Sequence, residues 1–308
     1  MSSSETQEEG PFQRYSRTPP SPSAFSQWGL PLILFSITGF TTLWAGAYYL
    51  RTDRAMGAWD FLIQHPDTLI LGLPFAGTLL AILVTHEFGH YILTRIHRLP
   101  ASLPLFIPGP PHFIGTFGAI IRMRTPIMNR RALFDIGVAG PIAGFIAAVI
   151  ALIVGLSFSE VIPRERGYGL QLGEPLLLQF FAWIILGPIP DTYDILLHPI
   201  GIAAWFGFFV TAINLIPLGQ LDGGHVAFAV FGSRQRAIAL SAIPILVYLG
   251  LTGWPGWLLW VALAGLVGIS HPPVVDPEAV LGRKRIWIAW SALGIFIVSF
   301  VPVPFYFG

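Results

Sequence analysis

Two histidines four residues apart, His86 and His90, flank Glu87 in the sequence H-E-F-G-H, within a stretch apolar enough to cross a membrane. On a helix, such histidines lie one turn apart on the same face and can bind one zinc ion. The glutamate between them can accept a proton from a water molecule held by the metal. The spacing therefore predicts hydrolytic chemistry, with chance occurrence of a short motif as the alternative.

A second polar segment follows more than 120 residues later, at residues 214–225, N-L-I-P-L-G-Q-L-D-G-G-H. Its proline and glycines are expected to unwind the end of an apolar helix, leaving Asp222 on irregular backbone at membrane depth. A catalytic zinc takes three protein ligands and keeps one position for water, a set that His86, His90 and Asp222 would complete. The alternative is that Asp222 caps a helix at the membrane surface.

The composition indicates a polytopic membrane protein. Of the 308 residues, 54% are hydrophobic and 11% are charged, whereas soluble domains carry about 25% charged residues. A net charge of +1 provides no basic field for nucleic acid, so nucleic-acid binding is excluded. Cysteine is absent, so any zinc must be bound by histidine and carboxylate.

The expected fold is all-α, with about six to eight transmembrane helices, because one crossing takes about 20 apolar residues. Residues 1–28, rich in Ser, Pro and Glu, are expected to form a disordered cytosolic tail, and residues 29–308 the transmembrane domain. The apolar stretch 175–189 is interpreted as re-entrant or interfacial. The candidate spans are residues 29–50, 68–96, 133–157, 198–216, 237–251, 254–270 and 286–303.

The basic residues favour this arrangement. With seven crossings, one face of the membrane receives 13 of the 17 basic residues, and the positive-inside rule makes that face cytosolic. The N-terminus is then cytosolic, and a bacterial inner membrane is the expected location, with an organelle membrane as the alternative. The cytosolic set is Arg14, Arg17, Arg95, Arg98, Arg122, Arg124, Arg130, Arg131, Arg234, Arg236, Arg283, Lys284 and Arg285, and the opposite set is Arg51, Arg54, Arg164 and Arg166.

Between the second and third candidate spans, residues 100–125 are apolar but interrupted by several prolines and glycines, which excludes a lipid-exposed helix. Residues 115–124 are predicted to form a short strand or hairpin near the active site, at the cytosolic membrane face. The exposed edge of such a strand can pair with an extended peptide. Further on, Gly137, Gly140 and Gly144 suggest close contact between helices, with lipid-facing small residues as the alternative.

The H-E-x-x-H motif followed by N-x-x-P-x-x-x-x-D-G resembles the site-2 protease family of intramembrane zinc metalloproteases, over a core of about residues 71–228. The resemblance implies one zinc ion per chain, bound by His86, His90 and Asp222, with Glu87 as the catalytic base. It also implies a partner: the transmembrane helix of a membrane-anchored substrate protein, cleaved within the lipid bilayer. Asn214 is a candidate donor to the developing oxyanion, or else a residue that orders the Asp222 loop.

The competing interpretation is a non-hydrolytic membrane scaffold or a transporter with a polar midplane site. Transporters often contain internal repeats, and no persuasive repeat occurs in this sequence. Serine or aspartyl proteases fit poorly, because the sequence has neither G-x-S-x-G nor a pair of aspartates on adjacent candidate spans. His225 is interpreted as a polar residue near a helix end, with a supporting partner of Asp222 as the alternative, and His271 as a surface or interfacial residue. Trp205 and its neighbouring phenylalanines are interpreted as packing residues.

Overall fold

The computed structural model describes residues 25–50, 56–123, 125, 127, 129–164, 170–271 and 274–307. Most of the expected tail, residues 1–24, lies outside this part. The last residues of the expected tail belong to a π-helical turn, η2 (Phe25–Gly29), that leads into the first long helix, α1 (Leu30–Tyr49). The basic residues of the orientation argument that lie outside the described part are Arg14, Arg17, Arg51, Arg54, Arg124 and Arg166.

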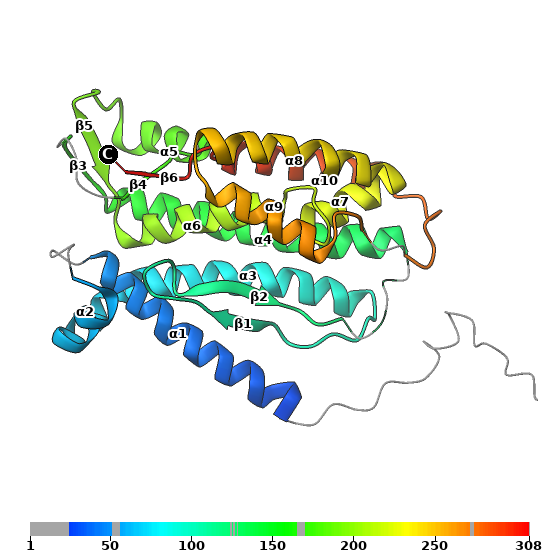
Figure 1. Cartoon of the computed structure of the whole chain (residues 1–308), viewed down its shortest axis with the longest axis horizontal. Helices are drawn as coiled ribbons and strands as arrows, with labels where there is room; N and C mark the ends of the chain where they lie inside the picture. The colour runs from blue at the N-terminus through cyan, green and yellow to red at the C-terminus, as the bar shows by residue number, and fades with distance from the viewer. Residues whose placement is uncertain are drawn as a thin grey trace, which may run out of the picture.

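The described chain is mostly helical, and its centre is formed by α3, α4 and α6, which contact one another (Figure 1). A short 3-10 helix, η3 (Pro66–Gly72), precedes α3, and another, η4 (Gly232–Arg234), joins α7 to α8. The helices after α1 are α2 (Ala58–Gln64), α3 (Leu73–Ile96), α4 (Arg130–Ser157), α5 (Leu176–Leu186), α6 (Pro199–Asn214), α7 (Asp222–Phe231), α8 (Gln235–Thr252), α9 (Gly256–Val267) and α10 (Arg283–Ser299).

Four helical segments of the described chain are long and apolar enough to cross a membrane: Gln27–Tyr49, Pro66–Ile96, Arg130–Ser157 and Asp222–Thr252. The last one joins α7 and α8, because η4 is a helical turn where the sequence suggested a loop. The other three candidate spans correspond to α6, α9 and α10, which have 16, 12 and 17 residues. These helices are shorter than a full crossing, so a total of six to eight crossings stays a prediction.

The strand predicted within residues 115–124 is confirmed as β2 (Thr116–Ile120), and its hairpin partner, β1 (Leu105–Pro108), lies earlier in the chain. Strand β1 pairs with β2 in antiparallel register, with Phe106 opposite Ala119. The hairpin runs alongside α3, and β1 contacts α1 (Figure 1). Within the described residues, β2 has no second strand partner, so its other edge is not paired with a strand.

Two further strand pairs lie together at one end of the molecule, beside the C-terminus (Figure 1). Strand β3 (Glu160–Pro163) pairs with β5 (Tyr193–Leu196), and β4 (Leu170–Leu172) pairs with β6 (Phe305–Phe307), both antiparallel. The second pair joins the last strand of the chain to the segment before α5. The C-terminal segment is therefore part of the folded body.

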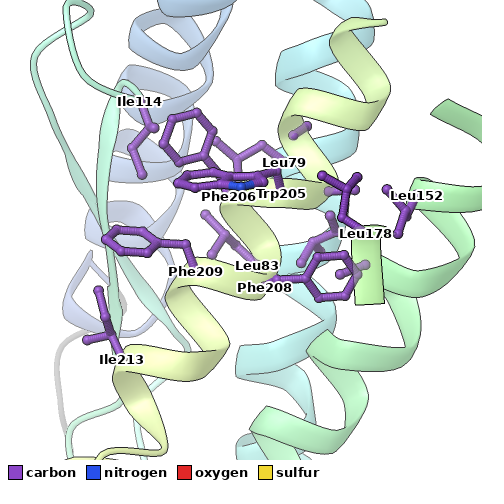
Figure 2. Packing of buried hydrophobic residues seen from close by; sticks show 14 of the residues in the cluster. Leu79, Leu83, Ile114, Leu152, Leu178, Trp205, Phe206, Phe208, Phe209 and Ile213 are labelled. Carbon is purple, nitrogen blue, oxygen red and sulfur yellow. The ribbon is translucent and has the colours of Figure 1, made fainter. Parts of the chain in front are cut away.

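Helix α6 is apolar on every side and supplies the aromatic centre of the core. Trp205, Phe206 and Phe208 are fully buried in a cluster that also contains Leu79 of α3 and Leu152 of α4 (Figure 2). The indole nitrogen of Trp205 donates a hydrogen bond to the Gly173 carbonyl at 2.6 Å, which satisfies its polar atom. Because lipid tails are as apolar as these side chains, such helices associate through close packing rather than through exclusion from water.

Candidate metal centre

Helix α3 presents His86 and His90 toward the interior of the protein. Their Nε2 atoms lie 3.2 Å apart, and their side chains are 4% and 12% exposed. Pro74 stands in the first turn of α3, where a missing backbone N–H costs nothing. The i, i+4 spacing then aims both imidazoles at one point.

Asp222 reaches the same point from α7. Its Oδ2 lies 3.3 Å from the Nε2 of both histidines. The expectation that Asp222 stands on irregular backbone was wrong in one respect, because Asp222 is the first residue of α7. Gly223 lets the loop pack against the first turn of α7. A Cβ at this position would lie 2.0 Å from the Leu215 carbonyl oxygen, so only glycine allows the contact.

Helix α4 supports the two histidines from behind. The Ile136 carbonyl lies 2.7 Å from His90 Nδ1, and since a carbonyl only accepts, Nδ1 carries the proton and Nε2 keeps its lone pair for a ligand. A Cβ on Gly140 would lie 2.0 Å from His90 Nε2, and one on Gly144 would lie 3.0 Å from His86 Nδ1. The close helix contact predicted from these glycines is confirmed.

Glu87 and Asn214 line the same pocket of about 340 Å³. Glu87 is 8% exposed, and the Asn214 side-chain nitrogen lies 3.4 Å from His86 Nε2. One wall of the pocket is formed by Ala119 to Ile121, at the end of β2. The hairpin therefore reaches the group of polar residues directly.

The donor set fits zinc. All three candidate ligand atoms lie within 4.8 Å of one another, and their pairwise distances are 3.2, 3.3 and 3.3 Å. Zinc bound by nitrogen and oxygen at about 2.0–2.2 Å in a tetrahedron implies about 3.3–3.6 Å between neighbouring ligand atoms, and the distances in this site lie at the short end of that range. Two histidines and one carboxylate therefore form one face of a tetrahedron and leave its fourth corner for water.

Two histidines lie beside this site, and only His271 was not connected with it from the sequence. His225 lines the pocket, and its Nδ1 lies 2.6 Å from Nε2 of His271, whose ring stacks on Phe228. The sequence predicts His225 to be either a partner of Asp222 or a polar residue near a helix end, and His271 to be a surface or interfacial residue. For His225 the pattern offered one signal, since it lies three residues after Asp222 and so near the same face of a helix. His271 comes 46 residues after His225, and no local pattern connects them.

The fold and the site together define a membrane-type helical protein with a buried two-histidine, one-carboxylate metal centre. The chain belongs to peptidase family M50, whose family model matches residues 74–252. The resemblance read from the two motifs is thereby confirmed. The matched residues include every candidate ligand as well as Glu87 and Asn214.

Similar curated proteins come from plants. A protein of Oryza sativa subsp. indica named "Probable zinc metalloprotease EGY2, chloroplastic" is 31% identical over 236 residues, covering 73% of this chain and 41% of that protein. The Arabidopsis thaliana protein of the same name is 29% identical, covering 94% and 51%. A third, "Probable zinc metalloprotease EGY1, chloroplastic" of Arabidopsis thaliana, is 28% identical, covering 92% and 55%.

The chain thus spans about half the length of these curated relatives. No solved structure gives a significant match.

Proposed function

We propose that this chain is an intramembrane zinc endopeptidase that hydrolyses peptide bonds within the transmembrane segments of membrane-tethered substrate proteins. One observation carries the proposal: His86, His90 and Asp222 place three ligand atoms at tetrahedral spacing in the pocket that Glu87 also lines. The names of the plant relatives, zinc metalloproteases, support it.

When bound by His86, His90 and Asp222, zinc supplies Lewis-acid chemistry that acidifies a water molecule and polarises the scissile carbonyl. Glu87 accepts the proton of the attacking water and passes it to the leaving amine. Glu87 is 8% exposed and lines the same pocket as the candidate ligands, so it lies beside the position of the attacking water. Asn214 donates a hydrogen bond to the developing oxyanion, a role that suits an amide 3.4 Å from one ligand.

The substrate is the transmembrane helix of a membrane-anchored protein, and part of it must unwind, because a helix shields its peptide bonds. The unpaired edge of β2 can form backbone hydrogen bonds with an extended substrate segment. These bonds would replace the ones that the substrate helix loses when it unwinds. Ala119 and Ile120 belong both to this strand and to the pocket wall. A segment paired with β2 would therefore lie beside the metal ligands.

The protein is placed in the lipid bilayer as a multi-pass membrane protein. Many of its large apolar side chains are exposed on α1, α8 and α9, as expected for lipid-facing surfaces. The cytosolic N-terminus rests on the basic residues alone and stays a prediction, as does the bacterial inner membrane. The plant relatives are named as chloroplastic.

The decisive experiment measures zinc and peptide hydrolysis together in detergent-purified full-length chain. We expect about one zinc per chain in the native protein, strong loss of zinc in Asp222→Ala, and retained zinc without hydrolysis in Glu87→Gln. Native protein that binds no zinc in metal-replete medium would refute the assignment. Retained zinc in Asp222→Ala would remove Asp222 from the ligand set, and hydrolysis by Glu87→Gln would remove the base.

A further inference from the structure

The loop between α6 and α7, residues 215–221, joins Asn214 to Asp222 and so carries two functional residues at its ends. Within it, the Leu218 amide bonds the Ile216 carbonyl at 2.7 Å and the Leu221 amide bonds the Leu218 carbonyl at 3.0 Å. Two short turns do not hold a carboxylate against two imidazoles. The position of Asp222 therefore depends on what the loop contacts.

The segment that follows α9, residues 268–271, lies directly against this loop. The Gly219 amide donates a hydrogen bond to the Ile269 carbonyl at 3.1 Å. Gly219 has φ +49, and a Cβ on it would lie 2.3 Å from the Gly268 carbonyl oxygen. The two backbones thus touch, and only glycine permits the contact at this position.

Gln235, the first residue of α8, joins the same two segments with its side chain. It is 1% exposed. Its Nε2 lies 3.4 Å from the carbonyls of Pro217 in the loop and Ile269 in the segment, and its Oε1 accepts from the His271 amide at 3.2 Å. A buried amide is destabilising without such partners, so Gln235 favours the arrangement that satisfies both ends of its side chain.

His271 ties the segment to the helix that begins with Asp222. Its Nε2 lies 2.6 Å from Nδ1 of His225, one turn into α7, while its ring stacks on Phe228. His225 also contacts α4. A Cβ on Gly137 of α4 would lie 2.9 Å from the Cβ of His225. The first turn of α7 is thus held between α4 and residues 268–271.

From these contacts we propose that residues 268–271 hold the loop and Asp222 in metal-binding position, with Gln235 and His271 as positioning residues. This rests on the proposed zinc site. Residues 268–271 lie beyond residues 74–252, the part matched by the family model. The metal centre of this chain therefore depends on a segment outside that part.

The test compares Gln235→Met and His271→Phe with the native full-length chain. Methionine keeps the size of the Gln235 side chain without its hydrogen bonds, and phenylalanine keeps the ring beside Phe228 without the nitrogen facing His225. Gln179→Met and His65→Phe are the matched controls, since Gln179 is exposed on α5 and His65 is an exposed ring beside Phe61.

Three quantities are measured: the rate at which zinc is lost to a chelator, the visible spectrum of the cobalt-loaded chain, and amide hydrogen exchange at residues 215–222. Loss of such supporting contacts costs about 10-fold or more in metal affinity. We expect zinc release to accelerate by about that factor in both variants, with a changed cobalt spectrum and faster exchange. Neither control should differ from the native chain.

Zinc release within about twofold of native in both variants, with unchanged exchange, would overturn the positioning role. Native chain that holds no zinc would refute the proposed function instead. Exchange at residues 215–222 in the metal-free chain would still decide the inference. Faster exchange in the variants supports it, and equal exchange refutes it.

Discussion

Gly140 of α4 lies against the imidazole of His90, so closely that a Cβ on this glycine would be 2.0 Å from Nε2. That distance is far inside van der Waals contact, and the atom approached is the proposed ligand atom itself. The approach of α4 to α3 and the orientation of His90 are therefore determined by the same position.

Substituting Gly140→Ala should displace His90 or push the helices apart. We expect zinc affinity to fall by about 10-fold or more, because the ligand loses its orientation. Zinc titration of the purified variant measures the effect. Gly77→Ala is the control, because Gly77 lies in α3, the helix of His90, and a Cβ on it meets no other described atom within 4 Å. Equal affinity in the two variants would show that α4 does not orient the ligand.

Asn214→Ala separates the two roles considered for this residue. If its amide stabilises the oxyanion, kcat should fall about 100-fold or more while zinc content is kept. Single-turnover cleavage of a membrane-embedded substrate, with zinc analysis of the same sample, is the measurement. A lower zinc content, with a nearly unchanged cleavage rate for each zinc-loaded molecule, would instead assign Asn214 to ordering of the loop.

Asp135 of α4 joins three helices at one end of the molecule. It accepts two hydrogen bonds from Arg285 of α10, both at 2.7 Å, and lies 3.0 Å from Nε2 of His97 at the end of α3. Arg285→Gln should lower the free energy of unfolding by about 1–2 kcal/mol, since a bidentate, partly buried pair is lost.

The control for this ion pair is Arg164→Gln. Arg164 lies 3.8 Å from Asp194, and their side chains are 53% and 42% exposed. Such an exposed pair contributes about 0–1 kcal/mol. Denaturant or thermal unfolding in detergent should therefore rank the Arg285 variant clearly below the Arg164 variant. The reverse order would mean that α10 is held mainly by apolar contacts.

The hairpin can be tested at Gly118, which has φ +92 and no other described atom within 4 Å of a Cβ. Gly118→Ala therefore adds backbone strain of about 1–3 kcal/mol without a steric clash. If β2 holds the substrate extended, KM should rise while zinc content stays unchanged. An unaltered KM would count against edge pairing. Proline is a poorer probe, because its φ near −65° reshapes the strand as well as removing a donor.

Local sequence patterns determined the helical face of the two histidines, the membrane character of the chain and the break in helical structure before α4. The spacing of His86 and His90 sets them on one helical face whatever the surroundings, and the low charge content requires a membrane environment. The prolines and glycines of residues 100–125 excluded a spanning helix, and the hairpin was predictable from them. The order of the two motifs also indicated which residues would meet.

Contacts between distant segments decided the rest. The 3.3 Å distances that place Asp222 between both histidines depend on how a seven-residue loop, 215–221, folds against residues 268–271. His271 and Gln235 carry no sequence signal, because their partners lie tens of residues away. The length of the segment formed by α7 and α8 likewise depends on the 3-10 turn at residues 232–234, which joins the two helices. Period and composition describe one segment at a time, whereas a metal centre is defined by the packing of several segments together.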